Sequence, residues 1–140
     1  MRLFAYVLGL ALLCCQPAQA QVRSYDQMIA AGEINVAVYK DFAPYSFEDG
    51  ATPRGVDVEL AQALAMALGV RLKLIWAPAG EKLDDDLRDY IWRGSPLHNQ
   101  QLADLMMRAP YDHEYTQKRN DQGELENGHV VMFGPYQNEQ

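Results

Sequence analysis

Apolar and polar positions alternate over residues 34–39, INVAVY, in which Ile34, Val36 and Val38 are β-branched. Alternation with a period of two, carried by β-branched residues, predicts a strand that enters a buried or half-covered sheet. A second apolar run over 70–76, VRLKLIW, predicts another strand that is exposed along part of its length. The chain therefore carries two strands close together in sequence.

A helix is predicted between these strands. Leu60, Leu64 and Leu68 recur at intervals of four, alanines widen the same face, and Gly69 is suited to end the helix. Asp57 stands at its start, where we expect its carboxylate to cap the free amides of the first turn. The order strand, helix, strand indicates a parallel sheet with a crossover helix, and hence an α/β fold.

Weaker patterns complete the expected order of elements. Ser24 and Gln27 have the spacing of a capping box for a short first helix that Gly32 ends. The later segments are predicted as a second crossover helix over 81–93, a third strand over 102–107 interrupted by Asp104, a short helix over 112–119, an acidic surface loop over 120–128 and a fourth strand over 130–133.

Three aromatic rings follow the first strand directly, in the segment 42–47, FAPYSF. Small molecules bind beyond the carboxyl ends of the strands in open parallel sheets, and this segment is predicted to lie there. Rings offer stacking area, and a carboxylate can hold an ammonium group. The predicted binding residues of this segment are therefore Asp41, Phe42, Tyr45 and Phe47. The alternative for Phe42 and Phe47 is that they pack beneath the loop as a small separate core.

The first twenty residues have the features of a cleavable secretory signal peptide. Arg2 gives a positive start, the apolar run 3–15 is short for a bilayer span, and Ala18 and Ala20 match the small-residue cleavage pattern. We expect cleavage after Ala20 and no stable membrane insertion afterwards. Both cysteines leave with this peptide, so the mature part is expected to have no disulfide, thiolate metal site or cysteine nucleophile.

The chain is acidic, with 12 Lys and Arg against 19 Asp and Glu and a formal charge of −7 at pH 7. Binding to nucleic acid needs a basic surface that neutralises phosphates, so a nucleic-acid partner is excluded. An acidic surface suits a cationic ligand or a basic protein partner, although solubility is the simpler explanation.

Four segments of the chain are similar to a known family: VAVYKDFAPYSFEDG, RGVDVELAQALAMALGV, LADLMMRAPYD and VVMFGPY. The chain resembles the family 3 periplasmic solute-binding proteins, and within them the branch associated with quinoprotein (PQQ-dependent) alcohol dehydrogenases. The resemblance implies a periplasmic location and two α/β lobes that close over a ligand, with FGPY near the crossing between them. Residues 21–140 are then expected to form the first lobe of a truncated protein, with the second lobe missing.

The resemblance also implies a function without catalysis. The first hypothesis is a solute-binding-like protein that is accessory to a quinoprotein alcohol dehydrogenase, with that dehydrogenase or a small polar solute as its partner. The alternative is the solute receptor of an ABC transporter, which delivers amino acids or other small polar solutes to a membrane permease.

Arg108 and Tyr111 follow the third predicted strand, in the second segment that contacts ligand in amino-acid-binding members of the family. Those members carry Thr-x-x-Arg slightly farther on, where the arginine holds the ligand carboxylate by a bidentate pair. His113 and Thr116 occupy these two positions here. Arg108 and Tyr111 complete the predicted ligand-binding set; the alternative for Arg108 is a surface salt bridge to one of the many carboxylates.

The remaining candidates for chemistry are weak. The carboxylates of 84–86 point around a helix instead of converging, so a solvated first turn is expected there and not a calcium site. His98, His113 and His129 lack the spacing of a zinc motif, and no nucleophile elbow, phosphate loop or dinucleotide fingerprint is present. An enzyme with Asp41 or Glu48 as general base has no partner group. We therefore expect no enzyme, no cofactor and no metal.

Overall fold

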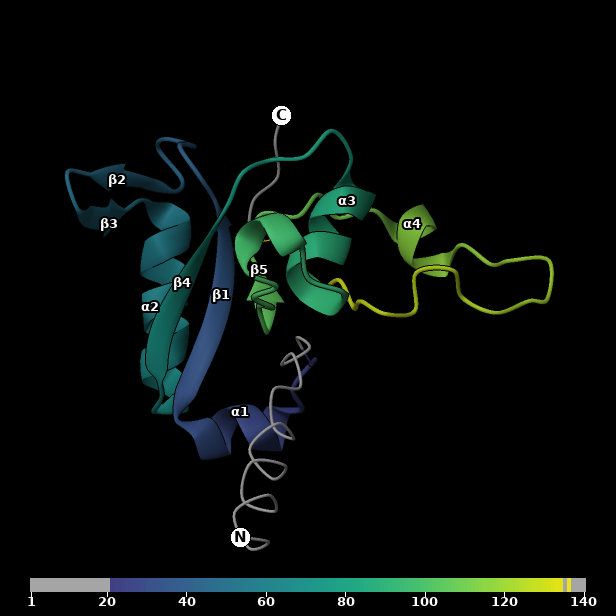
Figure 1. The fold of residues 1–140 in the computed structure, drawn as a ribbon, viewed down its shortest axis with the longest axis horizontal. Coiled ribbons are helices and arrows are strands. Elements are labelled where there is room, and N and C mark those ends of the chain that lie inside the picture. The colour runs from purple at the N-terminus through teal and green to yellow at the C-terminus, as the bar shows by residue number, and fades with distance from the viewer. Residues whose placement is uncertain (1–20, 135, 137–140) are drawn as a thin grey trace, which may run out of the picture.

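The computed structural model describes residues 21–134 and 136, and its centre is a parallel sheet of three strands in the order β4-β1-β5. Figure 1 shows β1, Glu33–Tyr39, and β4, Arg71–Ala77, as two long neighbouring strands. The two strands pair in parallel along their whole length. The predicted central strand over 34–39 and the α/β fold are thus confirmed. The predicted signal peptide, residues 1–20, lies outside the described residues.

Helix α2, Val56–Leu68, connects β1 to β4 and covers one face of the sheet (Figure 1). Ala61 and Ala65 of this helix belong to the same buried cluster as Val36 and Val38 of β1. Alanine has little side chain, so the helix backbone can lie close to the sheet. The predicted crossover helix over 57–68 is confirmed to within one residue.

Helix α1, Tyr25–Ala31, leads into β1 and starts with the predicted capping box. The Gln27 backbone N–H donates to Ser24 Oγ at 3.2 Å, and the Ser24 backbone N–H donates to Gln27 Oε1 at 2.8 Å. Two free amides of the helix end are satisfied in this way. The helix places Met28 in the buried cluster beneath the sheet.

The second crossover covers the opposite face of the sheet with helix α3, Leu83–Leu87, and the π-helical turn η1, Arg88–Trp92. Tyr90 is buried there with Ala37 of β1 and Ala103. The predicted helix over 81–93 is confirmed in position, although it starts two residues later and its second half is a π-helix. A 3-10 turn η2, Pro96–His98, follows.

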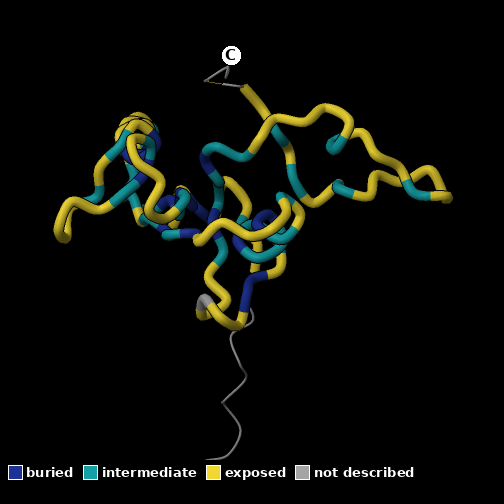
Figure 2. The backbone as a smooth tube through the Cα atoms, turned by 90° about the horizontal axis from the view of Figure 1, so that it is seen from above, coloured by how far each residue is buried: buried dark blue, intermediate teal, exposed yellow. Residues whose placement is uncertain are grey.

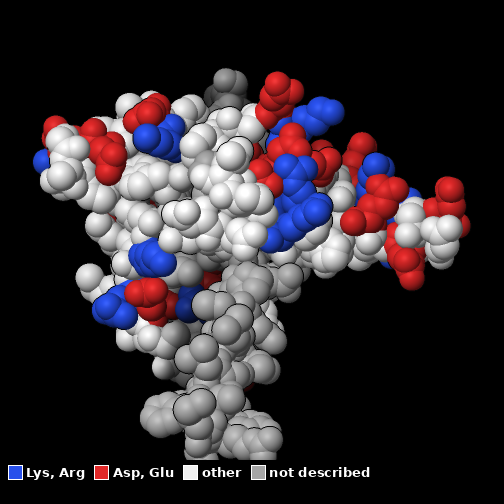
Figure 3. All heavy atoms as spheres, in the orientation of Figure 1, with Lys and Arg blue, Asp and Glu red and all other residues white. Residues whose placement is uncertain are grey.

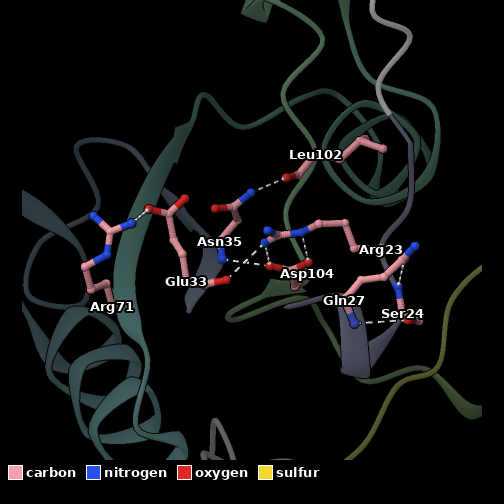
Figure 4. A network of polar contacts seen from close by, with 8 residues as sticks. All are labelled: Arg23, Ser24, Gln27, Glu33, Asn35, Arg71, Leu102 and Asp104. Atoms are coloured by element: carbon pink, nitrogen blue, oxygen red, sulfur yellow. Dashed lines mark hydrogen bonds and ion pairs between the residues drawn. The ribbon is translucent and has the colours of Figure 1, made fainter. Parts of the chain in front are cut away.

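Strand β5 is limited to Leu105–Met106, which pair with β1, whereas the sequence predicted a strand over 102–107. Asp104 accounts for the shorter strand, because its carboxylate accepts hydrogen bonds from the Arg23 guanidinium and, at 2.7 Å, from the Asn35 backbone N–H (Figure 4). The interruption that Asp104 makes in an apolar run is therefore an ion pair in the structure.

Two further contacts extend this network, which joins the segment before α1 to β1 and to the chain before β5 (Figure 4). Arg23 Nη2 donates to the Glu33 carbonyl at 3.2 Å, and Asn35 Nδ2 donates to the Leu102 carbonyl at 3.1 Å. The network fixes the free edge strand β5 against β1 through side chains as well as through the sheet.

The chain after β5 forms a largely exposed arm that contains helix α4, His113–Gln117, and the loop over 120–128 (Figure 2). The predicted loop is confirmed, but the predicted fourth strand over 130–133 is wrong, since these residues have no strand structure. Val131 and Phe133 are 83% and 71% exposed. β-branched residues form a strand only where a partner edge and a face to pack on are available, and here they have neither.

Candidate functional site

The aromatic loop, residues 42–47, lies at the carboxyl end of β1, where the sequence predicted it. It leads into a hairpin of β2, Phe47–Asp49, and β3, Thr52–Arg54, which projects beyond the end of α2 (Figure 1). Ser46 is buried and holds the loop onto the strand, because its hydroxyl donates to the Tyr39 carbonyl at 2.6 Å. The Ala43–Pro44 peptide bond is cis.

The rings of the loop form a partly open cluster. Phe42 is 43% exposed, and its ring centroid lies 5.3 Å from that of Tyr45 and 6.2 Å from that of Tyr39. Phe47 is half-buried and lines a shallow hollow with Pro44, away from this cluster. The alternative of a small core therefore suits Phe47 better than Phe42, whose ring remains available to solvent.

Asp57 does not cap helix α2, contrary to the prediction. The first-turn amides already have partners, because the Asp57 N–H donates to the Tyr45 carbonyl at 2.9 Å and the Val56 N–H to the Pro44 carbonyl at 3.4 Å. Gly55 occupies the N-cap position without a side-chain bond. The aromatic loop thus caps the helix with its backbone, and the carboxylate of Asp57 is left to pair elsewhere.

Asp57 pairs with Arg108, which follows β5. The Asp57 side chain is 0% exposed and that of Arg108 is 11% exposed, and the bond is bidentate: Nε lies 2.8 Å from Oδ2 and Nη2 lies 2.9 Å from Oδ1. The Tyr136 hydroxyl also donates to Asp57 Oδ1, at 3.1 Å. Of the two alternatives for Arg108, the structure shows a salt bridge, but a buried one.

The guanidinium of Arg108 also contacts aromatic faces. Its central carbon lies 3.5 Å from the ring centroid of Tyr45 and 5.6 Å from that of Tyr136. The hydrogen bonds to Asp57 raise the pKa of Arg108, while burial raises the pKa of Tyr136 to about 12, with the Asp57 charge adding to this shift. Arg108 itself has a left-handed backbone, φ 57°, which a non-glycine residue rarely adopts.

The six predicted binding residues do not share one pocket. Phe42, Tyr45 and Arg108 lie together, and Asp41 adjoins them on an exposed turn with φ 56°. Tyr111 is 51% exposed and lines, together with Arg108, a groove of about 1050 Å³ that residues of β5, α2 and the segment 129–134 also line. The structure therefore brings Phe42, Tyr45 and Arg108 together, with Asp41 directly before Phe42 in the chain, and these four residues are the candidate site. Phe47 and Tyr111 lie apart from it.

Sequence reasoning missed Asp57 and Tyr136 as members of this site. Asp57 is 51 positions before Arg108, and 79 positions separate it from Tyr136. Local pattern carries no information on pairs so distant, and an acidic residue near a helix start is usually a cap.

A second buried carboxylate, Asp86, lies at the same end of the sheet. It accepts hydrogen bonds from the Tyr39 hydroxyl at 2.8 Å and from the Gly80 N–H at 2.7 Å, and it is buried. The expectation of a solvated first turn over 84–86 is wrong for this residue. Within residues 21–134 and 136, no three His, Cys, Asp or Glu side chains are placed to hold a metal ion.

Charged side chains gather over the hairpin and over the side of the molecule that carries α3 and α4, with uncharged surface between them (Figure 3). Near the loop, Arg54 pairs with Asp49 at 3.1 Å on the exposed hairpin. In the described part of the chain, no helix has the length and hydropathy that crossing a bilayer requires.

Comparison with known proteins gives matches that cover part of the chain. A cyclohexadienyl dehydratase from Pseudomonas aeruginosa is 31% identical over 107 residues, which are 73% of this chain and 40% of the dehydratase. The chain thus spans less than half the length of this relative.

Solved structures match over shorter parts. Domain 1 of TmArgBP in its arginine-bound form is 28% identical, with 44% of this chain and 50% of that chain covered and a TM-score of 0.40. The amino acid ABC transporter substrate-binding protein AbpA from Streptococcus pneumoniae, bound to L-arginine, is 32% identical, with coverages of 46% and 27% and a TM-score of 0.35.

The family match covers the sheet and the candidate site together. The sequence profile described as bacterial extracellular solute-binding proteins, family 3, matches residues 34–118, which include β1, the aromatic loop, α2, β4, β5 and Arg108. The fold has the α/β character of periplasmic binding proteins, a mostly parallel sheet with helices on both faces. This chain belongs to the bacterial extracellular solute-binding proteins, family 3.

Proposed function

We propose that this protein is an exported, non-catalytic receptor that binds a small polar solute at the aromatic loop. The observation that carries the proposal is the open ring of Phe42 beside Tyr45 and Asp41, at the carboxyl end of the central strand of a family 3 solute-binding fold. This edge is where open α/β sheets bind small molecules. Rings with a neighbouring carboxylate provide stacking and a charged contact for such a solute.

A binding experiment on the complete protein tests this function. Ligand that binds only the folded state raises the midpoint of thermal unfolding, so a panel of amino acids, diamines, organic acids and alcohols should contain at least one stabilising solute. Phe42→Ala should reduce the affinity for that solute by about five- to tenfold, because ring stacking of this kind contributes about 1–1.5 kcal/mol. Tyr25→Ala removes an exposed ring far from the loop in sequence, on α1, and is the matched control. An unchanged affinity in Phe42→Ala would refute the site.

The accessory role beside a quinoprotein alcohol dehydrogenase is a second proposal. What supports it is the resemblance of the chain to the branch associated with these dehydrogenases. Amino acid uptake is disfavoured, because Arg108 is bound to Asp57, and His113 and Thr116 occupy the positions where amino-acid-binding members have Thr and Arg. A receptor for amino acid uptake would need such a clamp. In a pull-down from periplasm with the complete protein as bait, this proposal expects a quinoprotein dehydrogenase to be enriched. Enrichment of a membrane permease alone would favour the receptor of an ABC transporter.

The similarity to a cyclohexadienyl dehydratase makes catalysis a direct test of the non-catalytic proposal. The complete protein should show no cyclohexadienyl dehydratase activity above the level of the buffer. Turnover by the wild type that is lost in Asp41→Asn would show that the protein is an enzyme and not a non-catalytic receptor.

We also propose export by the signal peptide, for which a mature amino terminus at Gln21 is the expected result of terminal sequencing.

A further inference from the structure

The candidate site has an arginine that could serve a ligand carboxylate, but the Nε–Nη2 edge of its guanidinium is already bound to Asp57. Arg108 presents Nε and Nη2 to Asp57 at 2.8 and 2.9 Å, and its face lies 3.5 Å from the centroid of Tyr45. A carboxylate binds guanidinium best through two parallel hydrogen bonds. To take that pair from Asp57, a ligand would have to leave a fully buried carboxylate without its counter-charge, which is strongly unfavourable.

The other cations near the loop do not replace this clamp. Arg54 pairs with Asp49 across the exposed hairpin at 3.1 Å. Lys40 is exposed next to Asp41, and a lysine ammonium is a hydrated point charge on a flexible stem, without the planar fork that fixes a carboxylate. Among the described residues, neither of these two cations gives the site a pre-organised contact for a carboxylate.

The same loop is suited to a cation. Asp41 presents an exposed carboxylate on a turn with φ 56°, directly before the open ring of Phe42. A carboxylate beside an aromatic face attracts an ammonium or guanidinium group by charge and by the cation–π interaction. Glu48, also exposed, adds a negative charge at the start of the hairpin.

We propose that the site takes an organic amine or guanidine without a carboxylate, and discriminates against the corresponding amino acid. This inference rests on the proposed solute-binding function and adds the class of solute. The Asp57–Arg108 pair disfavours the carboxylate, because it keeps the Nε–Nη2 edge of the one arginine of the site occupied. Asp41 and Phe42 hold the cationic end.

Matched pairs of solutes that differ only by the carboxylate test this selectivity on the complete protein. Calorimetric titration is made with agmatine against arginine and with putrescine against ornithine. The expected result is that at least one amine binds ten or more times tighter than its amino acid. Equal or tighter binding of both amino acids would overturn the inference while leaving the receptor function intact. Binding of only a neutral or anionic solute from the wider panel would do the same, and the absence of any ligand would overturn both.

A charge variant separates the role of Asp41 from general electrostatics. Asp41→Asn should weaken binding of the preferred amine by about tenfold or more, whereas Asp121→Asn, an equal change of charge on the exposed arm, should leave it within about twofold. Equal effects of the two variants would show that the acidic surface as a whole attracts the cation, and would overturn the assignment to Asp41. Both side chains are exposed, so neither substitution is expected to disturb folding.

Discussion

Arg108 and Asp57 form a bidentate ion pair in which the carboxylate is completely buried and the guanidinium nearly so. The pair joins the segment after β5 to the first turn of α2, and Tyr136 adds a third contact to the same carboxylate. The carboxylate of Asp57 therefore holds together three segments of the chain that are distant in sequence. Removing one partner of such a pair leaves the other charge buried and unpaired.

Asp57→Asn should accordingly lower the free energy of unfolding by about 3 kcal/mol. The matched control is Glu59→Gln in the same turn of α2, where the carboxylate is exposed and only the helix dipole is affected, at a cost below about 1 kcal/mol. Urea unfolding of the complete protein followed by circular dichroism measures both. Equal losses would mean that the charge near the helix end, and not the pair with Arg108, is what stabilises the fold.

The central βαβ unit was predictable because its signal is local. The alternation over 34–39 and the recurrence of Leu60, Leu64 and Leu68 each reflect the face that one element buries, and both elements form as expected. The position of the aromatic loop followed from the direction of β1 alone. Fold class and the location of the candidate site could thus be inferred without knowledge of tertiary contacts.

The carboxylates were not predictable in the same way. Local rules predict a helix cap for Asp57, a solvated turn for Asp86 and a break in a strand for Asp104. In the structure each of these carboxylates accepts a hydrogen bond from a donor at least six positions away. Strand prediction over 130–133 failed for a related reason, because a β-branched sequence does not specify its partner edge. What the sequence lacks in each case is the identity of a distant neighbour.

The ion pair between Arg23 and Asp104 offers a contrast with a surface pair on the same sheet. Both side chains are mostly buried, and Asp104 also accepts from the Asn35 backbone (Figure 4). Arg23→Met should cost about 2–3 kcal/mol of stability, since it leaves a shielded carboxylate with one donor fewer. Arg71→Met removes the exposed pair with Glu33 and should cost below about 1 kcal/mol.

Salt adds a second measurement for these two variants. Exposed pairs are screened within a few ångströms at high ionic strength, whereas shielded pairs are screened much less. The difference in stability between wild type and Arg23→Met should therefore persist in 1 M sodium chloride, where the Debye length is only about 3 Å. A difference that vanishes in salt would show that Arg23 and Asp104 act as a solvated surface pair.

Tyr90 should make the protein sensitive to alkaline pH. Burial raises its pKa from 10.0 to about 12, with the charges of Asp86 and Asp89 contributing. Below about pH 10 the phenol is neutral in both states, but between about pH 10 and 12 the unfolded chain loses the proton first, so the free energy of unfolding falls as the pH rises. The full loss is at most about 3 kcal/mol, since each pKa unit corresponds to about 1.4 kcal/mol.

Urea midpoints between pH 9 and 12 measure this loss. Tyr90→Phe should flatten the decline in that interval, although other tyrosines with raised pKa, such as Tyr136, retain part of it. Tyr25→Phe, which removes an exposed tyrosine hydroxyl of α1, is the control for this substitution. A Tyr90→Phe protein with the full alkaline decline would contradict the assignment of the effect to this phenol.

Gly55 connects the aromatic loop to α2 and has no room for a side chain. A Cβ at this position would lie 2.1 Å from the carbonyl oxygen of Tyr45, and its φ of 117° is one that other residues rarely adopt. Gly55→Ala should therefore cost more than about 3 kcal/mol, from the clash and the strained backbone together. Gly50→Ala is the control, because Gly50 also has a left-handed φ, 66°, but nothing within 4 Å, so that about 1–2 kcal/mol is expected.

The clash at Gly55 bears on the site as well as on stability, because the Tyr45 carbonyl that it would displace accepts the Asp57 N–H. A shift of this carbonyl is expected to move the ring of Tyr45 away from the guanidinium of Arg108, which it contacts in the structure. Near-ultraviolet circular dichroism, which reports the environment of aromatic rings, should therefore change in Gly55→Ala under conditions where the far-ultraviolet spectrum shows a folded protein, and remain unchanged in Gly50→Ala. If both variants keep the wild-type aromatic spectrum, the backbone of the loop does not determine where the ring of Tyr45 lies. That result would contradict the proposed coupling between the loop and the Asp57–Arg108 ion pair.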